Sequence, residues 1–336
     1  MQAAVARSLG GPDVVRVEDV PSPSLTPGTA RVAVHSAAVN FPDLLVLAGK
    51  YQAKVPPPYT PGCEFSGRVV EVAPDVTRVR VGDVVFGLAT HGAFAEEVVL
   101  DASRLTALPA GAAVDMRQLA AFGVTYTTAY HALRTFAEVQ PGDYVTVLGA
   151  SGGLGLAAVD IATALGAKPI AVGGDPAKLA VATARGARAA VDYTAEDVKA
   201  RLNELTDGGA SVVIDPVGGP YAEPALRAMR WGGRYVVLGF AAGDIPRIPL
   251  NLVLLKGIRV MGFENRTILD HIPEAASAHR AEVLKLFLDG AVQPHVGAVY
   301  PLNQVGSALR DLAERRAVGK VVVSISELQV QPNEAP

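Results

Sequence analysis

Apolar and polar residues alternate over short runs between about residue 14 and residue 108. The runs are rich in β-branched residues and are separated by Gly-, Pro- and Asp-containing turns, a pattern typical of strands. The clearest runs predict strands at 31–35, 67–72, 83–87 and 95–100. We therefore expect a compact, barrel-like β domain in this part of the chain.

A different pattern begins near residue 119. A helical stretch extends to about residue 138, and a buried strand is expected at 144–148. After a glycine-rich turn, apolar residues recur at the spacing of one helix face. These residues are Leu154, Ala157, Ala158, Ile161 and Leu165. A strand at 169–172 follows this helix.

Helices and strands continue to alternate as far as residue 238. The predicted helices and strands are, in chain order, 176–184, 189–191, 197–205, 211–214, 221–229 and 234–238. Strands that alternate with helices of about ten residues form a parallel sheet with crossover connections. The fold class expected for this region is therefore α/β, with a doubly wound parallel sheet.

The chain is expected to divide into two domains, as its length of 336 residues also suggests. The α/β domain is placed at 120–262. Residues 1–119 begin the β-rich domain and residues 263–336 return to it, because the chain ends in a predicted helix at 302–315 and a strand at 320–325.

The composition is that of a globular protein, with 50% apolar and 19% charged residues. The net charge is −3 and there is no basic block, which argues against a dedicated nucleic-acid binder. One cysteine, Cys63, excludes a disulfide framework and a cysteine-rich zinc site. The N-terminus has no apolar signal sequence, and no stretch of about 18 apolar residues could span a bilayer. A cytoplasmic enzyme is the expectation.

The glycine-rich turn GASGGLG at 149–155 is the strongest chemical signal. Gly149, Gly152 and Gly155 permit a tight turn, a close approach of the backbone to a pyrophosphate, and close packing of helix on strand. Free amides and the helix dipole near Gly153 favour anionic phosphates. The turn follows a strand, opens an amphipathic helix and precedes a second strand, a context that predicts a dinucleotide site.

The second strand ends without the acidic residue that an NAD site places there. Gly173 and Gly174 are followed by Asp175, which lies two or three residues late for the usual ribose contact. Lys178 could neutralise the 2′-phosphate of NADP or could be a solvated lysine on a helix face. The spacing alone leaves both open.

Several segments together resemble the zinc-free quinone oxidoreductases, the zeta-crystallin-like branch of the medium-chain dehydrogenase/reductase superfamily. They are AAVNFPDLL (37–45), PGCEFSG (61–67), VGDVVFG (81–87), GASGGLG (149–155), DPVGG (215–219) and WGGRYVVLGFA (231–241). The resemblance implies a GroES-like catalytic domain split around a Rossmann domain. It also implies NADPH in the cleft, with hydride passing to a quinone or an activated alkene.

The resemblance also implies roles for individual residues. It implies that Asn40 and Thr125 lie near the nicotinamide and its ribose. It implies that the pyrophosphate is held by Gly149, Ser151, Gly152, Gly153 and Leu154. On the 2′-phosphate side it implies Gly174, Lys178 and Tyr193. It also implies that Phe240 and Ala241 line the cofactor channel and that Arg315 lies near the phosphates. Many NADPH-specific relatives have a serine near position 174 and an arginine after the tyrosine, where this chain has Gly174 and Thr194.

Zinc-dependent relatives bind their catalytic metal through a cysteine and a histidine of the first domain. Here Asn40 stands at the cysteine position and Cys63 at the histidine position. No native zinc site is therefore expected, and alcohol oxidation is disfavoured without a Lewis acid. Tyr51 matches a family tyrosine at the cleft mouth and could donate or orient a proton, or could be a half-buried structural residue. Asp43 is interpreted as structural.

The leading functional hypothesis is an NADPH-dependent quinone reductase. A reductase of enones or enoyl thioesters, such as acryloyl- or crotonyl-CoA, uses the same cofactor geometry and stays open. A non-catalytic NADPH-binding protein with a structural or RNA-associated role is the alternative from a different class. The strands at 234–238 and 258–261 are expected at the open end of the Rossmann sheet, where a second copy would form a homodimer.

Overall fold

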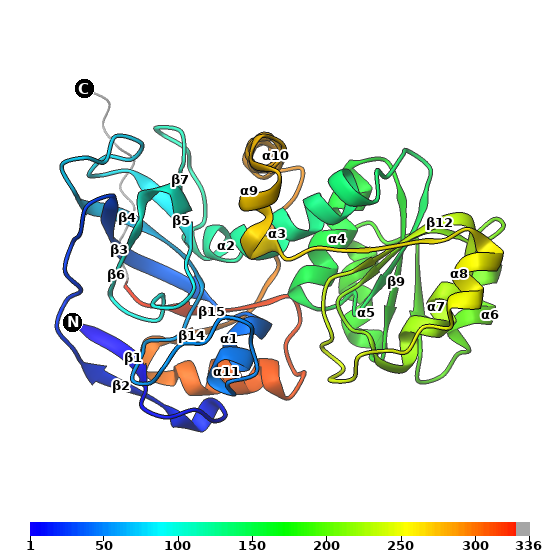
Figure 1. Ribbon diagram of the computed structural model, residues 1–336, viewed down its shortest axis with the longest axis horizontal. Coiled ribbons are helices and arrows are strands. Elements are labelled where there is room, and N and C mark those ends of the chain that lie inside the picture. The colour runs from blue at the N-terminus through cyan, green and yellow to red at the C-terminus, as the bar shows by residue number, and fades with distance from the viewer. Residues whose placement is uncertain (327–336) are drawn as a thin grey trace. The chain divides into compact units, whose positions relative to one another are not determined.

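The computed structural model describes residues 1–326, which fold as two units (Figure 1). The first unit comprises Met1–Val124 and the segment that begins at Pro294, and the second comprises Thr125–Gln293. Within residues 1–326, no helix combines the length and the apolar character needed to cross a membrane.

The first unit is built on a seven-stranded sheet, as its β-rich sequence predicts. Its order is β14 (Val296–Pro301), β15 (Lys320–Ser324), β3 (Thr29–Ala38), β4 (Glu64–Val72), β5 (Val84–Leu88) and β7 (Leu105–Ala107), and β6 (Glu97–Asp101) pairs with β3. A separate two-stranded sheet pairs β1 (Gln2–Ala6) with β2 (Val15–Asp19). Helix α1 (Phe41–Leu47) contacts α11 (Val305–Ala313), and α2 (Met116–Ala120) packs on β3 and β4.

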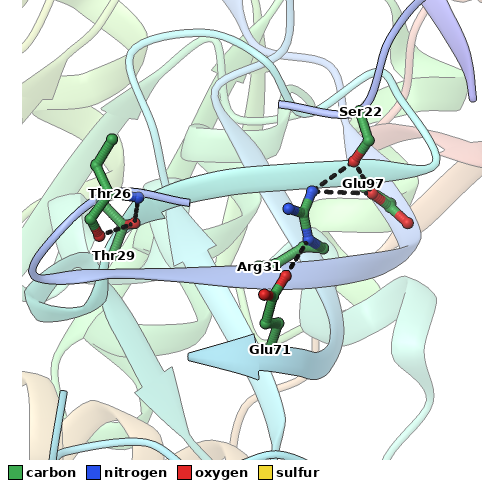
Figure 2. A network of polar contacts seen from close by, with 6 residues as sticks. All are labelled: Ser22, Thr26, Thr29, Arg31, Glu71 and Glu97. Atoms are coloured by element: carbon green, nitrogen blue, oxygen red, sulfur yellow. Dashed lines mark hydrogen bonds and ion pairs between the residues drawn. The ribbon is translucent and has the colours of Figure 1, made fainter. Parts of the chain in front are cut away.

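The long strand β3 shows why this sheet forms. Its alternate residues Ala30, Val32 and Val34 are buried in the core, which is the period of a strand with one solvated face. On that solvated face Arg31 donates to Glu71 Oε2 of β4 at 2.9 Å and to Glu97 Oε2 of β6 at 3.1 Å (Figure 2). These charge pairs cross from β3 to two of its neighbours, β4 and β6, and support their register.

The second unit contains a six-stranded parallel sheet, which confirms the predicted α/β class. Its order is β10 (Ala189–Asp192), β9 (Lys168–Gly173), β8 (Tyr144–Leu148), β11 (Ala210–Asp215), β12 (Met229–Val237) and β13 (Arg259–Gly262). The order starts at a central strand, runs outward, and restarts on the other side of β8, as in dinucleotide-binding folds. The helices against the sheet are α4 (Gly153–Ala164), α5 (Pro176–Ala184), α6 (Val198–Leu205), α7 (Ala222–Arg227) and α8 (Leu250–Lys256).

The helical stretch expected from about residue 119 to residue 138 is confirmed, and the structure divides it into separate helical elements. α2 ends at Ala120, α3 spans Gly123–Tyr130, and a π-helical turn spans His131–Phe136. Arg234 stabilises the end of the stretch by donating to the carbonyl oxygens of Ala137 and Glu138 at 2.7 and 3.2 Å.

Residues 263–293 were expected to return to the first domain, but they fold with the second unit. They include α9 (Ile268–His271) and the long helix α10 (Pro273–Leu288), which sequence reasoning missed. Contacts far apart in sequence explain the difference. Phe263 stacks on Phe136 with ring centroids 4.4 Å apart, and Tyr130 Oη donates to Glu282 at 2.5 Å.

The two strands expected at the open end of the Rossmann sheet are the last two in its order. The strand predicted at 234–238 belongs to β12, which pairs on both sides, with β11 and with β13. β13 is the edge strand at this end of the sheet, and β10 is the edge strand at the other end.

Candidate functional site

The turn between β8 and α4 has the backbone geometry that an anion-binding loop requires. Gly149 adopts φ +62°, and a Cβ at Gly155 would lie 2.2 Å from the carbonyl oxygen of Gly149. Neither position can carry a side chain without shifting the turn, because the first needs left-handed backbone and the second touches backbone atoms. The glycines predicted from sequence therefore bring α4 directly against the end of β8.

The first turn of α4 lacks a side-chain cap. Its N-cap residue is Gly152, which has no side chain to accept from the helix amides. The residues from Ser151 to Leu154 are half-buried, whereas α4 beyond Leu154 is buried from Gly155 to Ala162. Amides at a helix N-terminus that no side chain caps bind phosphate well, with the helix dipole in support. This arrangement fits the pyrophosphate of a dinucleotide.

The end of β9 forms the candidate adenosine side. Asp175 caps α5 by accepting from the amides of Ala177 and Lys178 at 2.9 and 3.2 Å. The aspartate is thus engaged with helix backbone, and these hydrogen bonds reduce, without removing, the repulsion that its charge would exert on a 2′-phosphate. The Lys178 side chain projects from the first turn of the same helix and is half-buried.

Two tyrosines stack beside this helix. The rings of Tyr193 and Tyr221 are 4.0 Å apart between centroids, with an interplanar angle of 28°. A Cβ at Gly174 would lie 2.5 Å from Cε2 of Tyr193, so the ring lies directly over that glycine. Gly174 and Tyr193 were predicted together, while Tyr221 was missed. Its only signal in the sequence is an aromatic residue two positions after the DPVGG segment.

The loop after β12 approaches the same edge of the sheet. The amide of Ala241 donates to the carbonyl of Pro216 at 3.1 Å, and Phe240 is 36% exposed. Val217 links this loop to the glycine turn, because its Cγ2 would be 2.7 Å from a Cβ at Gly149. The structure thus brings the predicted residues of β8, β9 and β12 together at the carboxyl ends of the strands, where α/β folds bind ligands.

Asn40 lies in the first unit within a buried polar cluster. Its side-chain nitrogen, Nδ2, donates to Glu64 Oε2 at 2.8 Å and to the carbonyl of Ala38 at 3.1 Å. Its Oδ1 accepts from the ammonium of Lys320 at 2.6 Å. Sequence reasoning missed Glu64 and Lys320, whose signal was a charged residue at the start of an apolar strand.

Asp43 and Cys63 lie beside this cluster. Asp43 Oδ2 accepts from the backbone amide of Asn40 at 2.8 Å, and the thiol of Cys63 is hydrogen-bonded to the same carboxyl group. Burial raises the pKa of Asp43 to about 7 and holds the pKa of the Cys63 thiol well above its ordinary range. The raised pKa disfavours the thiolate, which is the form of cysteine that binds metals.

The remaining predicted residues occupy separate places. Tyr51 is partly buried and packs against the core of the first unit. Thr125 is 5% exposed in α3 of the second unit. Arg315 follows α11 in the first unit, where it is exposed and has φ +57°. The roles that the resemblance implies for these three residues stay predictions.

No group of three or more His, Cys, Asp or Glu residues within 1–326 is arranged to hold a metal ion. Beside Asn40, which the resemblance sets at the position of a zinc ligand, the cluster contains the Lys320 ammonium, hydrogen-bonded to the Asn40 side chain. A cation placed there would meet a positive charge at close range in a buried environment.

A split β-rich unit joined to a Rossmann unit, with a glycine turn built for a pyrophosphate, defines a nucleotide-dependent dehydrogenase or reductase of the medium-chain type. Two family models match the chain: the alcohol dehydrogenase GroES-like domain over residues 26–110 and zinc-binding dehydrogenase over residues 153–279. The chain belongs to the medium-chain dehydrogenase/reductase superfamily, among quinone oxidoreductase-like proteins.

Individual relatives support this assignment. Quinone oxidoreductase-like protein 2 of Bos taurus is 39% identical over 327 residues, 96% of this chain and 92% of that protein. The quinone oxidoreductase of Thermus thermophilus, whose NADPH complex is also solved, is 33% identical with a TM-score of 0.81, over 97% of this chain and 100% of that one. The Escherichia coli quinone oxidoreductase complexed with NADPH is 26% identical with a TM-score of 0.89, over 96% of this chain and 100% of that one.

Proposed function

We propose that this chain is an NADPH-dependent oxidoreductase that reduces quinones. The observation that carries the proposal is the pyrophosphate turn combined with an adenosine side that has a lysine and no acidic residue at the end of β9. Similar structures crystallised with NADPH support the choice of cofactor. NADPH would supply the hydride. The chain binds and orients it, and it acts without a metal.

Each part of the binding site has a distinct task. The amides from Ser151 to Leu154 hold the pyrophosphate at the N-terminus of α4. The ammonium of Lys178 pairs with the 2′-phosphate, and Tyr193 packs against the adenosine. Phe240 and Ala241 line the channel, and Arg315 adds positive charge near the phosphates.

The substrate needs only modest assistance from the protein. A quinone that accepts a hydride becomes a hydroquinone anion, in which the charge is delocalised over the ring. It then takes up one proton, from solvent or from the phenol of Tyr51. Asn40 and Thr125 orient the nicotinamide end so that the hydride and the acceptor carbon meet at reacting distance.

The protein is proposed to act as a homodimer in the cytoplasm. β13 is the edge of the six-stranded sheet, and large apolar side chains lie exposed near it. They are Trp231 (78% exposed), Leu250 (77%), Leu254 (80%), Leu255 (70%) and Val260 (42%). A strand with one unpaired edge beside exposed apolar residues favours pairing with a second copy of the chain.

The deciding experiment measures NADPH oxidation with 9,10-phenanthrenequinone and with crotonyl-CoA under matched conditions. Faster turnover of the quinone by at least tenfold in kcat/KM is expected. Preferential turnover of crotonyl-CoA would assign the enoyl thioester alternative instead. NADPH binding without turnover of either acceptor would favour the non-catalytic alternative. A salt-dependent gel shift with RNA would then test the RNA-associated form of that alternative.

A further inference from the structure

The carboxylate of Glu64 is a junction between three parts of the first unit. Its Oε2 accepts from Asn40 Nδ2 at 2.8 Å and from Lys320 Nζ at 3.1 Å. Its Oε1 accepts from the backbone amide of Val124 at 2.7 Å. Glu64 is fully buried, and Lys320 is 4% exposed.

Strand pairing brings these residues together. β15 runs antiparallel to β3 with Val322 opposite Ala38, a register that sets Lys320 opposite Asn40 just beyond the end of β3. Glu64 begins β4, whose next residue, Phe65, pairs with Ala37. The cluster is therefore a product of the sheet, although its members are separated by up to 280 positions.

Every side-chain donor of Lys320 and Asn40 in this cluster has a hydrogen-bond acceptor. Lys320 uses its three ammonium protons on the carbonyl of Val39 at 3.0 Å, on Asn40 Oδ1 and on Glu64 Oε2. Both amide protons of Asn40 are also used, on Glu64 and on Ala38. With donors and acceptors both engaged, the Asn40 amide has one favourable orientation.

A buried ion pair of this kind adds little net stability compared with apolar residues of the same volume, but it specifies one geometry. Neither charged side chain is exposed enough to touch a substrate. The hydrogen-bond partners of this ion pair connect it to the candidate site. They are Asn40 and the backbone amide of Val124, the residue before Thr125.

We propose that Glu64 and Lys320 are positioning residues for hydride transfer, acting through the side chain of Asn40 and through the backbone amide of Val124, the residue before Thr125. The inference rests on the proposed function, in which Asn40 and Thr125 lie beside the nicotinamide. One carboxylate holds the Asn40 side chain directly and fixes the backbone one residue before Thr125, so it helps to set the position of the nicotinamide ring relative to the acceptor. A displacement of about 1 Å at such a site reduces the rate by about a hundredfold.

The test is the double variant Glu64→Gln/Lys320→Met. It removes both buried charges at nearly constant volume, so no unpaired charge remains, and the side-chain oxygen of the introduced glutamine can still accept from Val124. The orientation of Asn40 is lost, because the introduced glutamine amide and methionine thioether cannot reproduce the contacts that the carboxylate and the ammonium make with it.

Three measurements separate positioning from folding. We expect kcat for quinone reduction to fall ten- to a hundredfold, and the primary isotope effect with NADPH deuterated at the transferred position to rise. We expect the Kd of adenosine 2′,5′-bisphosphate to stay within twofold, because that probe reaches only the adenosine side. We also expect the nicotinamide fluorescence of bound NADPH to change, a readout that needs no turnover.

A matched control removes another buried pair. Arg234 donates to Asp143 Oδ2 at 2.7 Å, at the amino end of β8, which is the opposite end of that strand from the glycine turn. The variant Asp143→Asn/Arg234→Met should lower the thermal midpoint without changing the isotope effect or kcat by more than twofold.

A second variant, Glu64→Asp, keeps the charge pair but withdraws the carboxylate from Val124, so it tests the inference should the double variant not fold. A folded variant of either kind with kcat and isotope effect within twofold of wild type would overturn the inference alone. A wild type that neither binds the bisphosphate nor oxidises NADPH would overturn the proposed function, and the inference with it.

Discussion

The ring of Tyr193 covers Gly174 so closely that a Cβ on the glycine would lie 2.5 Å from the ring. Tyr221 stacks on Tyr193 with ring centroids 4.0 Å apart, so the ring of Tyr193 is packed against both Gly174 and Tyr221. The serine that many NADPH-specific relatives have near this position would require the ring to move. The candidate adenosine side of this chain therefore contains an aromatic pair next to Gly174.

This packing predicts that Gly174→Ser weakens NADPH binding, although serine offers a hydroxyl to the phosphate. The added Cβ displaces Tyr193, and we expect the Kd of adenosine 2′,5′-bisphosphate to rise about tenfold, or about 1.4 kcal/mol. Combining Gly174→Ser with Tyr221→Ala makes room for the ring and should recover most of the affinity. Calorimetric titration measures both, and tighter binding by the single variant would contradict the steric explanation.

Cofactor preference is expected to depend on Lys178. A charge-assisted contact with the 2′-phosphate contributes about 1.5–3 kcal/mol, which corresponds to about ten- to a hundredfold in affinity. We expect NADPH to exceed NADH at least tenfold in kcat/KM, and Lys178→Ala to remove most of that margin by raising KM for NADPH alone. Asp175→Ser should widen the margin, since serine also caps α5 and carries no charge.

The matched control for this experiment is Lys199→Ala, which removes an exposed lysine from α6 of the same unit. It should leave the ratio of the two cofactors unchanged. Equal use of both cofactors by the wild type, with no response to Lys178→Ala, would overturn the assignment.

Activity should not depend on zinc. Lys320 Nζ is 2.6 Å from Asn40 Oδ1, so a metal at the relatives' zinc position would be repelled by a buried ammonium. We expect metal analysis to show far less than one zinc per chain, and EDTA to leave NADPH oxidation unchanged. Cys63→Ala should retain activity. Stoichiometric zinc with activity lost to EDTA and regained on zinc addition would refute this prediction.

The proposed dimer predicts a defined sensitivity to charge near β13. Leu254 is 80% exposed on α8, and Leu254→Asp would place a carboxylate in the proposed interface. Light scattering of the wild type should give about twice the 34.8 kDa of one chain, and the variant should shift toward the monomer. Val81→Asp, at a residue 63% exposed in the first unit, is the control and should stay dimeric.

Asp43 predicts a pH dependence of stability. Burial raises its pKa to about 7, above the value near 4 of an unfolded chain, so the folded protein binds the extra proton. Its stabilising contribution is complete below about pH 4 and is lost as the pH rises through 7.

The substitution Asp43→Asn should remove this dependence of the free energy of unfolding on pH. Between pH 5 and 7 the stability of the wild type relative to the variant is expected to fall by at most about 1.4 kcal/mol per pH unit. Urea unfolding at several pH values measures it, with the exposed Asp270→Asn as control. A difference that stays constant across this range would show that Asp43 does not titrate as its burial implies.

Much of the second unit could be predicted from sequence because its determinants are local. The strand, glycine turn and helix from Tyr144 to Ala164 follow one another directly, and the backbone requirements of each glycine arise from its neighbours. The helix predicted at 176–184 has the bounds of α5, since Asp175 provides the cap and Pro176 starts the helix. The glycine turn and its backbone geometry could thus be predicted from the sequence.

What the tertiary structure decided depends on pairing between distant segments. Lys320 faces Asn40 only because β15 pairs with β3, and no local pattern encodes that register. Likewise, Tyr221 reaches Tyr193 because β10 and β11 belong to one sheet, and α10 joins the second unit through contacts with residues about 150 positions earlier. Local propensity and spacing determined the elements and the cofactor turn. Long-range strand order determined which buried charges meet, because the free energy of such contacts exists only after the sheet has closed.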